Sequence, residues 1–159
     1  MMKLLLSVGF FFLSACSETT AVETPIQYVT LEKAKAVSLS AKGQTQAVVT
    51  ASVLKDHHIQ ANPATLPNLI PTELTFEALS GVEVGKVVYP ASKPWKLTSA
   101  AKVIQTYEGK VDFKAPLKAS GIKPGKYELK GTLRYQACND KNCFFPMTIP
   151  VSIPLTVSQ

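Results

Sequence analysis

The sequence predicts an all-β protein with an immunoglobulin-like β-sandwich, because short alternating segments and turn signals fill most of the chain. Of its 159 residues, 46% are hydrophobic and 18% are charged, which is a globular composition with enough apolar residues for one core. Eleven prolines and eight glycines beside only 8% aromatic residues favour many short strands and turns. We expect roughly seven to nine strands, and a small barrel is the alternative architecture.

Six segments have the alternation or the β-rich composition of strands. In chain order they are residues 44–54, 72–79, 82–89, 106–117, 126–137 and 144–157. Within the second of these, Leu74, Phe76 and Ala78 alternate with polar residues, which is the pattern of a strand with one buried face. Glycine-containing turn signals, such as the one at Gly81, separate several of the segments.

The last segment is interrupted by Pro146, Pro150 and Pro154. Proline has no N–H group to donate to a β-ladder, so it is tolerated mainly in edge strands and bulges. We therefore expect this segment to be an edge strand or a strand broken by bulges.

The first sixteen residues, MMKLLLSVGFFFLSAC, have the order of a secretion signal. Lys3 precedes the apolar run 4–13, which at about ten residues is too short to span a bilayer. The run ends in the sequence LSAC, with the cysteine at position 16, and this resembles the lipobox of bacterial lipoproteins. An ordinary cleaved signal with a cysteine there by chance is the alternative.

The lipobox resemblance implies a signal peptide at 1–15, cleaved before Cys16, which would carry acyl chains. Several acyl chains anchor a protein to a membrane surface without spanning it. Residues 16–25 are small and polar and would form a flexible tether, and residues 26–159 would form the folded domain. Ser17 favours the outer membrane over the inner membrane, since retention at the inner membrane usually requires aspartate there.

The formal charge of +6 does not predict nucleic-acid binding. The lysines are scattered singly, and no run of them is interleaved with aromatic residues, as a nucleic-acid surface requires. We expect a solvated basic surface and no nucleic-acid partner. The sequence also lacks a nucleophile elbow, a Ser-His-Asp grouping and a phosphate-binding loop, so it does not support hydrolytic catalysis.

The stretch QACNDKNCFFP carries a close cysteine pair, Cys138 and Cys143. In an oxidising compartment such a pair is a structural disulfide, part of a metal site or a redox couple. By strand alternation, Cys138 continues the polar face of its strand, whereas a core disulfide would lie on the apolar side. If Cys138 faced Cys143 in a regular hairpin, apolar residues would oppose polar ones along its whole length, so we expect a bulge within 143–146.

The short ring that this pair would close favours a redox role over a structural one. Stabilisation by a disulfide grows with loop length, and a ring this small gives about 2 kcal/mol before strain. Lys141 lies between the cysteines and would favour a thiolate, whereas Asp140 would oppose it.

The run GKYELKGTLRYQACNDKNCFFPMTIPVSIPLTV resembles the N-terminal periplasmic domain of the thiol:disulfide interchange protein DsbD. Upstream, DHHIQANPATLPNLIPTELTF, GVEVGKVVYP and TYEGKVDF are similar to the same family and occur in the expected order. The resemblance covers about residues 28–157. The paired-cysteine hairpin, with Tyr-Gln before it and proline after it, is its most specific part.

The resemblance implies an immunoglobulin-like sandwich whose cysteines alternate between dithiol and disulfide without a cofactor. Electrons would come from a thioredoxin-like or membrane donor and pass to periplasmic disulfide-bearing proteins. Cys143 would form the mixed disulfide with partners and Cys138 would resolve it. A member of the family shields its disulfide with a cap loop that bears an aromatic residue. Trp95 is the nearest candidate for that residue here, and ordinary partial burial is its alternative role; Tyr135 and Phe144 flank the pair in the sequence.

Two other readings of the cysteine pair stay open. A copper or other metal module would use the cysteines with Met147 and one of His57 and His58, because adjacent residues of a strand point to opposite faces. We expect no metal, since the cysteine spacing alone is a weak metal signal. A lipid-anchored structural or binding module would use the pair as a local disulfide.

Overall fold

The computed structural model describes residues 26–98 and 102–159, which form twelve strands in three sheets. The predicted signal peptide (1–15), Cys16 and the predicted tether (16–25) lie outside these residues. Among the described residues, no helix has the length and apolar character needed to cross a membrane.

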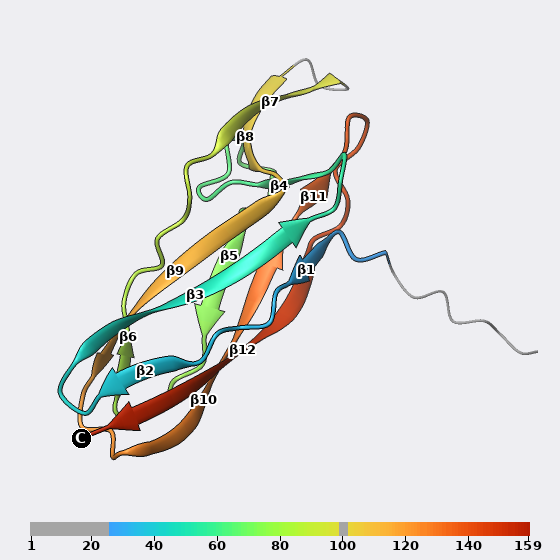
Figure 1. Ribbon diagram of the computed structural model, residues 1–159. Helices are drawn as coiled ribbons and strands as arrows, with labels where there is room; N and C mark the ends of the chain where they lie inside the picture. The colour runs from blue at the N-terminus through green and yellow to red at the C-terminus, as the bar shows by residue number, and fades with distance from the viewer. Residues whose placement is uncertain (1–25, 99–101) are drawn as a thin grey trace, which may run out of the picture.

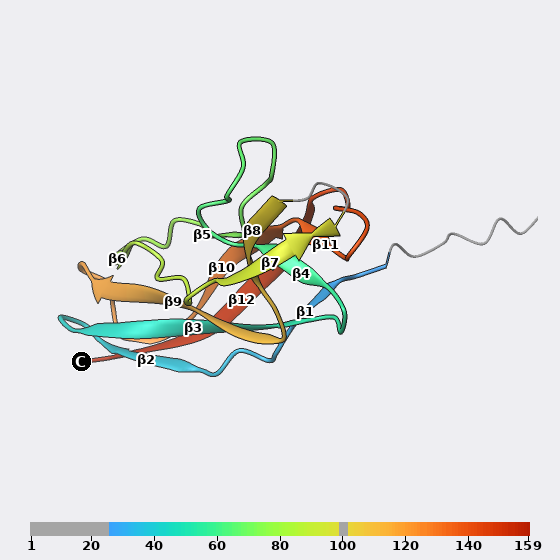
Figure 2. The same ribbon diagram turned by 90° about the horizontal axis from the view of Figure 1, so that it is seen from above.

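Two four-stranded sheets form a sandwich, and a smaller third sheet extends it. The first sheet has the order β1 (Val29–Leu31), β3 (Gln44–Val53), β9 (Lys110–Ala119) and β6 (Val82–Val84). The second has the order β2 (Val37–Ser40), β12 (Met147–Ser158), β10 (Gly125–Tyr135) and β5 (Glu73–Phe76). The third has the order β11 (Ala137–Cys138), β4 (His58–Gln60), β8 (Lys102–Tyr107) and β7 (Lys93–Leu97). In Figures 1 and 2 the third sheet lies at the end of the molecule away from the C-terminus.

The core lies between the two large sheets, as the alternation of the sequence requires. Every second residue of the long strands β3, β9, β10 and β12 is buried or half-buried, while most of the residues between them face solvent. The largest fully buried side chains include Phe113, Leu117, Leu129, Leu133, Tyr135, Ile153 and Leu155. The predicted all-β immunoglobulin-like sandwich is therefore confirmed.

The prediction of one strand over 106–117 is wrong. That segment contains the end of β8 at Tyr107, a turn, and the start of β9 at Lys110. Gly109 has φ +63°, a conformation that glycine adopts without steric penalty and that ends the strand. The two halves then enter different sheets, so this turn connects the third sheet to the sandwich.

The prediction of an edge strand at the C-terminus holds for only part of β12. The end of this strand, from Leu155 to Val157, lies between β10 and β2, so it is not an edge. Pro150 and Pro154 lie before Leu155, in the stretch of β12 that pairs with β10 alone. The prolines thus occupy the portion of the strand where a missing donor is tolerated.

The predicted register shift beside the cysteines is confirmed. Tyr135 faces Met147 at the end of the β10–β12 ladder, and Cys138 faces Cys143 in an isolated bridge. Two residues (136–137) separate the pairs on one strand and three (144–146) on the other, so the second strand carries one extra residue. This bulge lets the apolar faces of β10 and β12 match along the hairpin while the cysteines still meet.

Candidate redox site

The hairpin loop brings the two cysteines together. Side-chain Oδ1 of Asn139 accepts hydrogen bonds from the backbone N–H groups of Lys141 (3.0 Å) and Asn142 (2.9 Å). This is the local bonding that makes asparagine favourable in turns. Cys138 and Cys143 form a disulfide with an S–S distance of 2.03 Å and a Cα–Cα distance of 3.9 Å.

The two sulfur-bearing residues differ in burial. Cys138 is 0% exposed, whereas Cys143 is half-buried. The expectation that Cys138 continues a polar, solvent-facing surface is therefore wrong. Its strand, β11, leaves the second sheet and pairs with β4, where Cys138 lies opposite His58. The third sheet covers the face that the alternation assigns to solvent, and a thiolate from outside reaches the pair more readily at Cys143.

A buried amide, which the sequence analysis missed, lies against the disulfide. Gln60 in β4 is 0% exposed, and its Nε2 donates to Sγ of Cys138 at 3.0 Å and lies 3.9 Å from Sγ of Cys143. Its Oε1 is buried and has no hydrogen-bond partner among the described residues. Gln60 precedes Cys138 by 78 positions in a three-residue strand, so no sequence spacing links them.

A second amide holds the bulge in place. Gln136 Oε1 accepts from the backbone N–H of Ile70 (2.8 Å), and its Nε2 donates to the backbone oxygen of Phe144 (3.1 Å). The backbone N–H of Phe144 in turn donates to the oxygen of Ala137 (2.8 Å). These bonds fix the segment that follows Cys143 and connect it to the loop after β4.

Phe144, predicted to flank the site, belongs to an aromatic cluster on one side of the hairpin. Its ring stacks on Tyr28 with centroids 4.4 Å apart, and the ring of His57 lies 5.0 Å from that of Tyr28. Tyr135, the other predicted flanking residue, is fully buried, and its hydroxyl donates to Sδ of Met147 at 3.5 Å. Burial raises the pKa of Tyr135, so this residue packs beneath the site as a neutral phenol.

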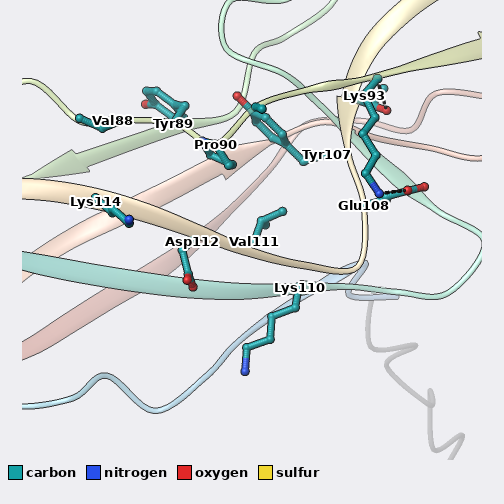
Figure 3. A pocket seen from close by; sticks show the side chains of 12 residues that line it. Val88, Tyr89, Pro90, Lys93, Tyr107, Glu108, Lys110, Val111, Asp112 and Lys114 are labelled. Atoms are coloured by element: carbon teal, nitrogen blue, oxygen red, sulfur yellow. Dashed lines mark hydrogen bonds and ion pairs between the residues drawn. The ribbon is translucent and has the colours of Figure 1, made fainter.

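Trp95, the predicted cap, contacts the site through His58. The two rings are stacked with centroids 4.5 Å apart, and His58 faces Cys138 across the β4–β11 pair. Nδ1 of His58 lies 3.5 Å from Oε2 of Glu108, with no hydrogen-bond partner among the described residues. Glu108 is bound by Lys93 at 2.6 Å, a contact drawn in Figure 3.

Burial lowers the pKa of His58 from its ordinary value of 6.5, and the attraction of Glu108 and Asp140 offsets only part of that effect. The hydrogen bond from Lys93 lowers the pKa of Glu108. His58 is therefore predominantly neutral near pH 7, and the negative charge of Glu108 is balanced by Lys93.

An apolar groove opens beside Cys143. It has a volume of about 510 Å³ and is lined by Ile26, Tyr28, Gln136, Cys143, Phe144, Phe145, Pro146 and Met147. Phe145, which lies at the edge of this groove, is 92% exposed. A second pocket of about 390 Å³, drawn in Figure 3, is lined by residues 88–91, Lys93 and residues from the end of β8 to β9, and it contains neither cysteine. The groove at Cys143 is thus the one of the two that adjoins the half-buried sulfur.

The described residues contain no group of three or more His, Cys, Asp or Glu side chains placed to hold a metal ion. The two histidines lie in separate clusters, His57 beside Tyr28 and His58 beside Trp95, and of the two only His58 belongs to a strand. The geometry around the cysteines is that of a disulfide with an amide donor and an adjoining apolar groove.

Comparisons with known proteins give one family match. The model of the family described as thiol:disulfide interchange protein DsbD, N-terminal, matches residues 26–153. The N-terminal periplasmic domain of ScsB from Proteus mirabilis is 14% identical with a TM-score of 0.48, over 80% of this chain and 44% of that one. The N-terminal domain of DsbD from Neisseria meningitidis, in its reduced form, is 12% identical with a TM-score of 0.43, over 67% of this chain and 74% of that one. Among curated proteins, no sequence matches this chain.

The lowered pKa of His58 predicts a pH-dependent stability. The unfolded chain binds a proton at the ordinary pKa of 6.5, while the folded chain resists protonation. Stability is therefore independent of this group well above that pH, and it falls as the pH drops from 6.5 to the lower pKa of the folded state. Urea unfolding of the oxidised protein between about pH 7.5 and 5 should give a steeper loss of stability than in His58→Phe, which keeps a ring against Trp95. Equal slopes in the two proteins would contradict this assignment.

Proposed function

Because this chain belongs to the family of the N-terminal domain of the thiol:disulfide interchange protein DsbD, we propose that it carries out thiol–disulfide exchange through Cys138 and Cys143. The observation that carries the proposal is the asymmetric disulfide, with one sulfur-bearing residue fully buried and the other half-buried beside an apolar groove. Exchange requires access to one sulfur, and the buried sulfur acts as the intramolecular partner.

In the proposed reaction, a donor thiolate attacks Sγ of Cys143. The Cys138–Cys143 bond breaks, a mixed disulfide forms between the donor and Cys143, and the bond's electron pair leaves with Cys138 as a thiolate. The donor's second thiol then attacks its own sulfur in the mixed disulfide and releases Cys143. Two electrons and two protons pass from the donor dithiol to this pair. The same steps in reverse order reduce a substrate disulfide, with Cys143 attacking and Cys138 resolving.

The proposed partners follow from the family and from the groove. The donor is a thioredoxin-like or membrane-embedded electron carrier, and the acceptors are disulfide-bearing proteins of the periplasm. The family operates in the periplasm or cell envelope. Acylation of Cys16 would hold this domain at a membrane surface, with the outer membrane favoured by Ser17.

A redox role predicts a reduction potential within the range of exchange proteins. The full chain carrying Cys16→Ser, equilibrated in glutathione or dithiothreitol buffers, should give a value between about −180 and −270 mV for the Cys138–Cys143 pair. A value well below about −300 mV would identify a structural disulfide and would refute the proposed exchange.

The proposed roles of the two cysteines predict different trapping behaviour. In Cys138→Ser the mixed disulfide between Cys143 and a thioredoxin-like partner has no resolving thiol on this chain. We expect it to accumulate on a non-reducing gel when the partner also lacks its second cysteine. In Cys143→Ser the remaining thiol is fully buried, so little complex should form. Equal trapping by the two variants would contradict the assignment.

The groove predicts a partner-specific effect of Phe145. Burying this exposed side chain against a protein partner stabilises the encounter by about 1.5–3 kcal/mol, so Phe145→Ser should slow exchange with thioredoxin about tenfold or more. Reduction by dithiothreitol, which is too small to use the groove, should be unchanged. Val88→Ser is the control, because Val88 is 53% exposed but lines the pocket that lacks the cysteines. Equal slowing in both variants would exclude the groove as the contact surface.

A further inference from the structure

The backbone of Gln60 is positioned by the pairing of β4 with β8, in which Gln60 lies opposite Thr106. The backbone N–H of Gln60 donates to the backbone oxygen of Gln136 at 3.1 Å, and its backbone oxygen accepts from Oγ1 of Thr72 at 2.6 Å. The side chain is 0% exposed, so its polar atoms have no access to water. A buried amide with an unpaired oxygen lowers stability, and a residue placed there only for packing would avoid that cost.

The hydrogen bond from Gln60 is weak in the disulfide state and becomes strong during exchange. A disulfide sulfur is a poor acceptor, whereas a thiolate carries a full negative charge, and a hydrogen bond to a charged group is roughly twice as strong as a neutral one. Nε2 lies nearer to Cys138 (3.0 Å) than to Cys143 (3.9 Å). The donor is therefore already placed against the sulfur that leaves when Cys143 is attacked, which is the geometry of electrostatic preorganisation.

We propose that Gln60 is a catalytic residue that stabilises the departing Cys138 thiolate, a role that rests on the exchange function proposed above. When a partner thiolate attacks Cys143, the electron pair of the disulfide moves onto Cys138, and Nε2 of Gln60 donates a hydrogen bond to that charge. No further reactant is needed.

Charged groups near the pair do not replace this donor. The titratable residues around it are His58 on β4, Asp140 and Lys141 in the hairpin loop, Glu108 after β8 and Lys93 on β7. The lowered pKa of His58 leaves it mainly neutral near pH 7, and Lys93 binds Glu108. Among the described residues, the recorded hydrogen-bond donor to Cys138 is the neutral amide of Gln60.

The test compares Gln60→Leu with Thr72→Val, both in the full chain carrying Cys16→Ser. Thr72→Val removes the bond to the backbone of Gln60 but leaves the amide–sulfur contact, so it controls for local disturbance. The rate constant of disulfide reduction by dithiothreitol at neutral pH should fall about tenfold or more in Gln60→Leu, the equivalent of a lost charge-assisted hydrogen bond. In Thr72→Val it should change less than about threefold.

A second measurement reports on the thiolate itself. With Cys143→Ser added, the ultraviolet absorbance of the Cys138 thiolate gives the pH at which half of the thiol is ionised. Gln60→Leu should move this pH upward by roughly one unit, while Thr72→Val should not. Gln60→Met, which keeps the length of the side chain without a donor, should behave like Gln60→Leu and serves if the leucine variant does not fold.

The outcomes separate the two proposals. Unchanged rate and unchanged ionisation in the Gln60 variants, or equal effects in Thr72→Val, would overturn the role of Gln60. A parent protein with a potential below about −300 mV would refute the exchange function, yet the ionisation measurement would still decide whether Gln60 stabilises the thiolate.

Discussion

The site depends on a one-residue difference in register within a single hairpin, between the β10–β12 ladder and the bridge of the two cysteines. The long β10–β12 ladder places Tyr135 opposite Met147, because only that register keeps both apolar faces against the core. The cysteine bridge places Cys138 opposite Cys143. The extra residue between these pairs directs Phe145 into solvent beside Cys143 and places Phe144 against Tyr28. A bulge required by core packing thus also contributes residues to the apolar groove beside Cys143.

The third sheet gives the disulfide its asymmetry. After Tyr135 the chain leaves the second sheet, and β11 pairs with β4, so Cys138 is covered from the side that would otherwise face solvent. Cys143 lies beyond β11 and stays half-buried. The same pairing brings the side chain of Gln60 to Cys138. It also places His58, whose ring stacks on Trp95, opposite Cys138. The short strand β4 therefore covers the sulfur of Cys138 and supplies the groups around it, while the sulfur of Cys143 stays accessible.

The sequence predicts those features that depend on local alternation and fails where distant segments cover one another. The bulge at 143–146 follows from the period of two residues in the flanking strands, which is a local property. Burial of Cys138 depends on β4, a three-residue strand about 80 positions upstream whose apolar content is one isoleucine. Gln60 has no spacing relation to the cysteines for the same reason. Alternation does not predict the burial of Cys138, because it cannot detect a third layer.

The contributions to stability around the disulfide favour a redox role for it over a structural one. The core is built from strands in which every second side chain is buried, and the short disulfide ring adds little to it. The residues around the sulfurs instead reduce stability. Oε1 of Gln60 is buried without a partner among the described residues, and the His58 ring is only 14% exposed and resists protonation. A disulfide that existed only to stabilise the chain would gain nothing from an unsatisfied amide beside it, whereas a sulfur that becomes a thiolate requires a donor held in place beforehand.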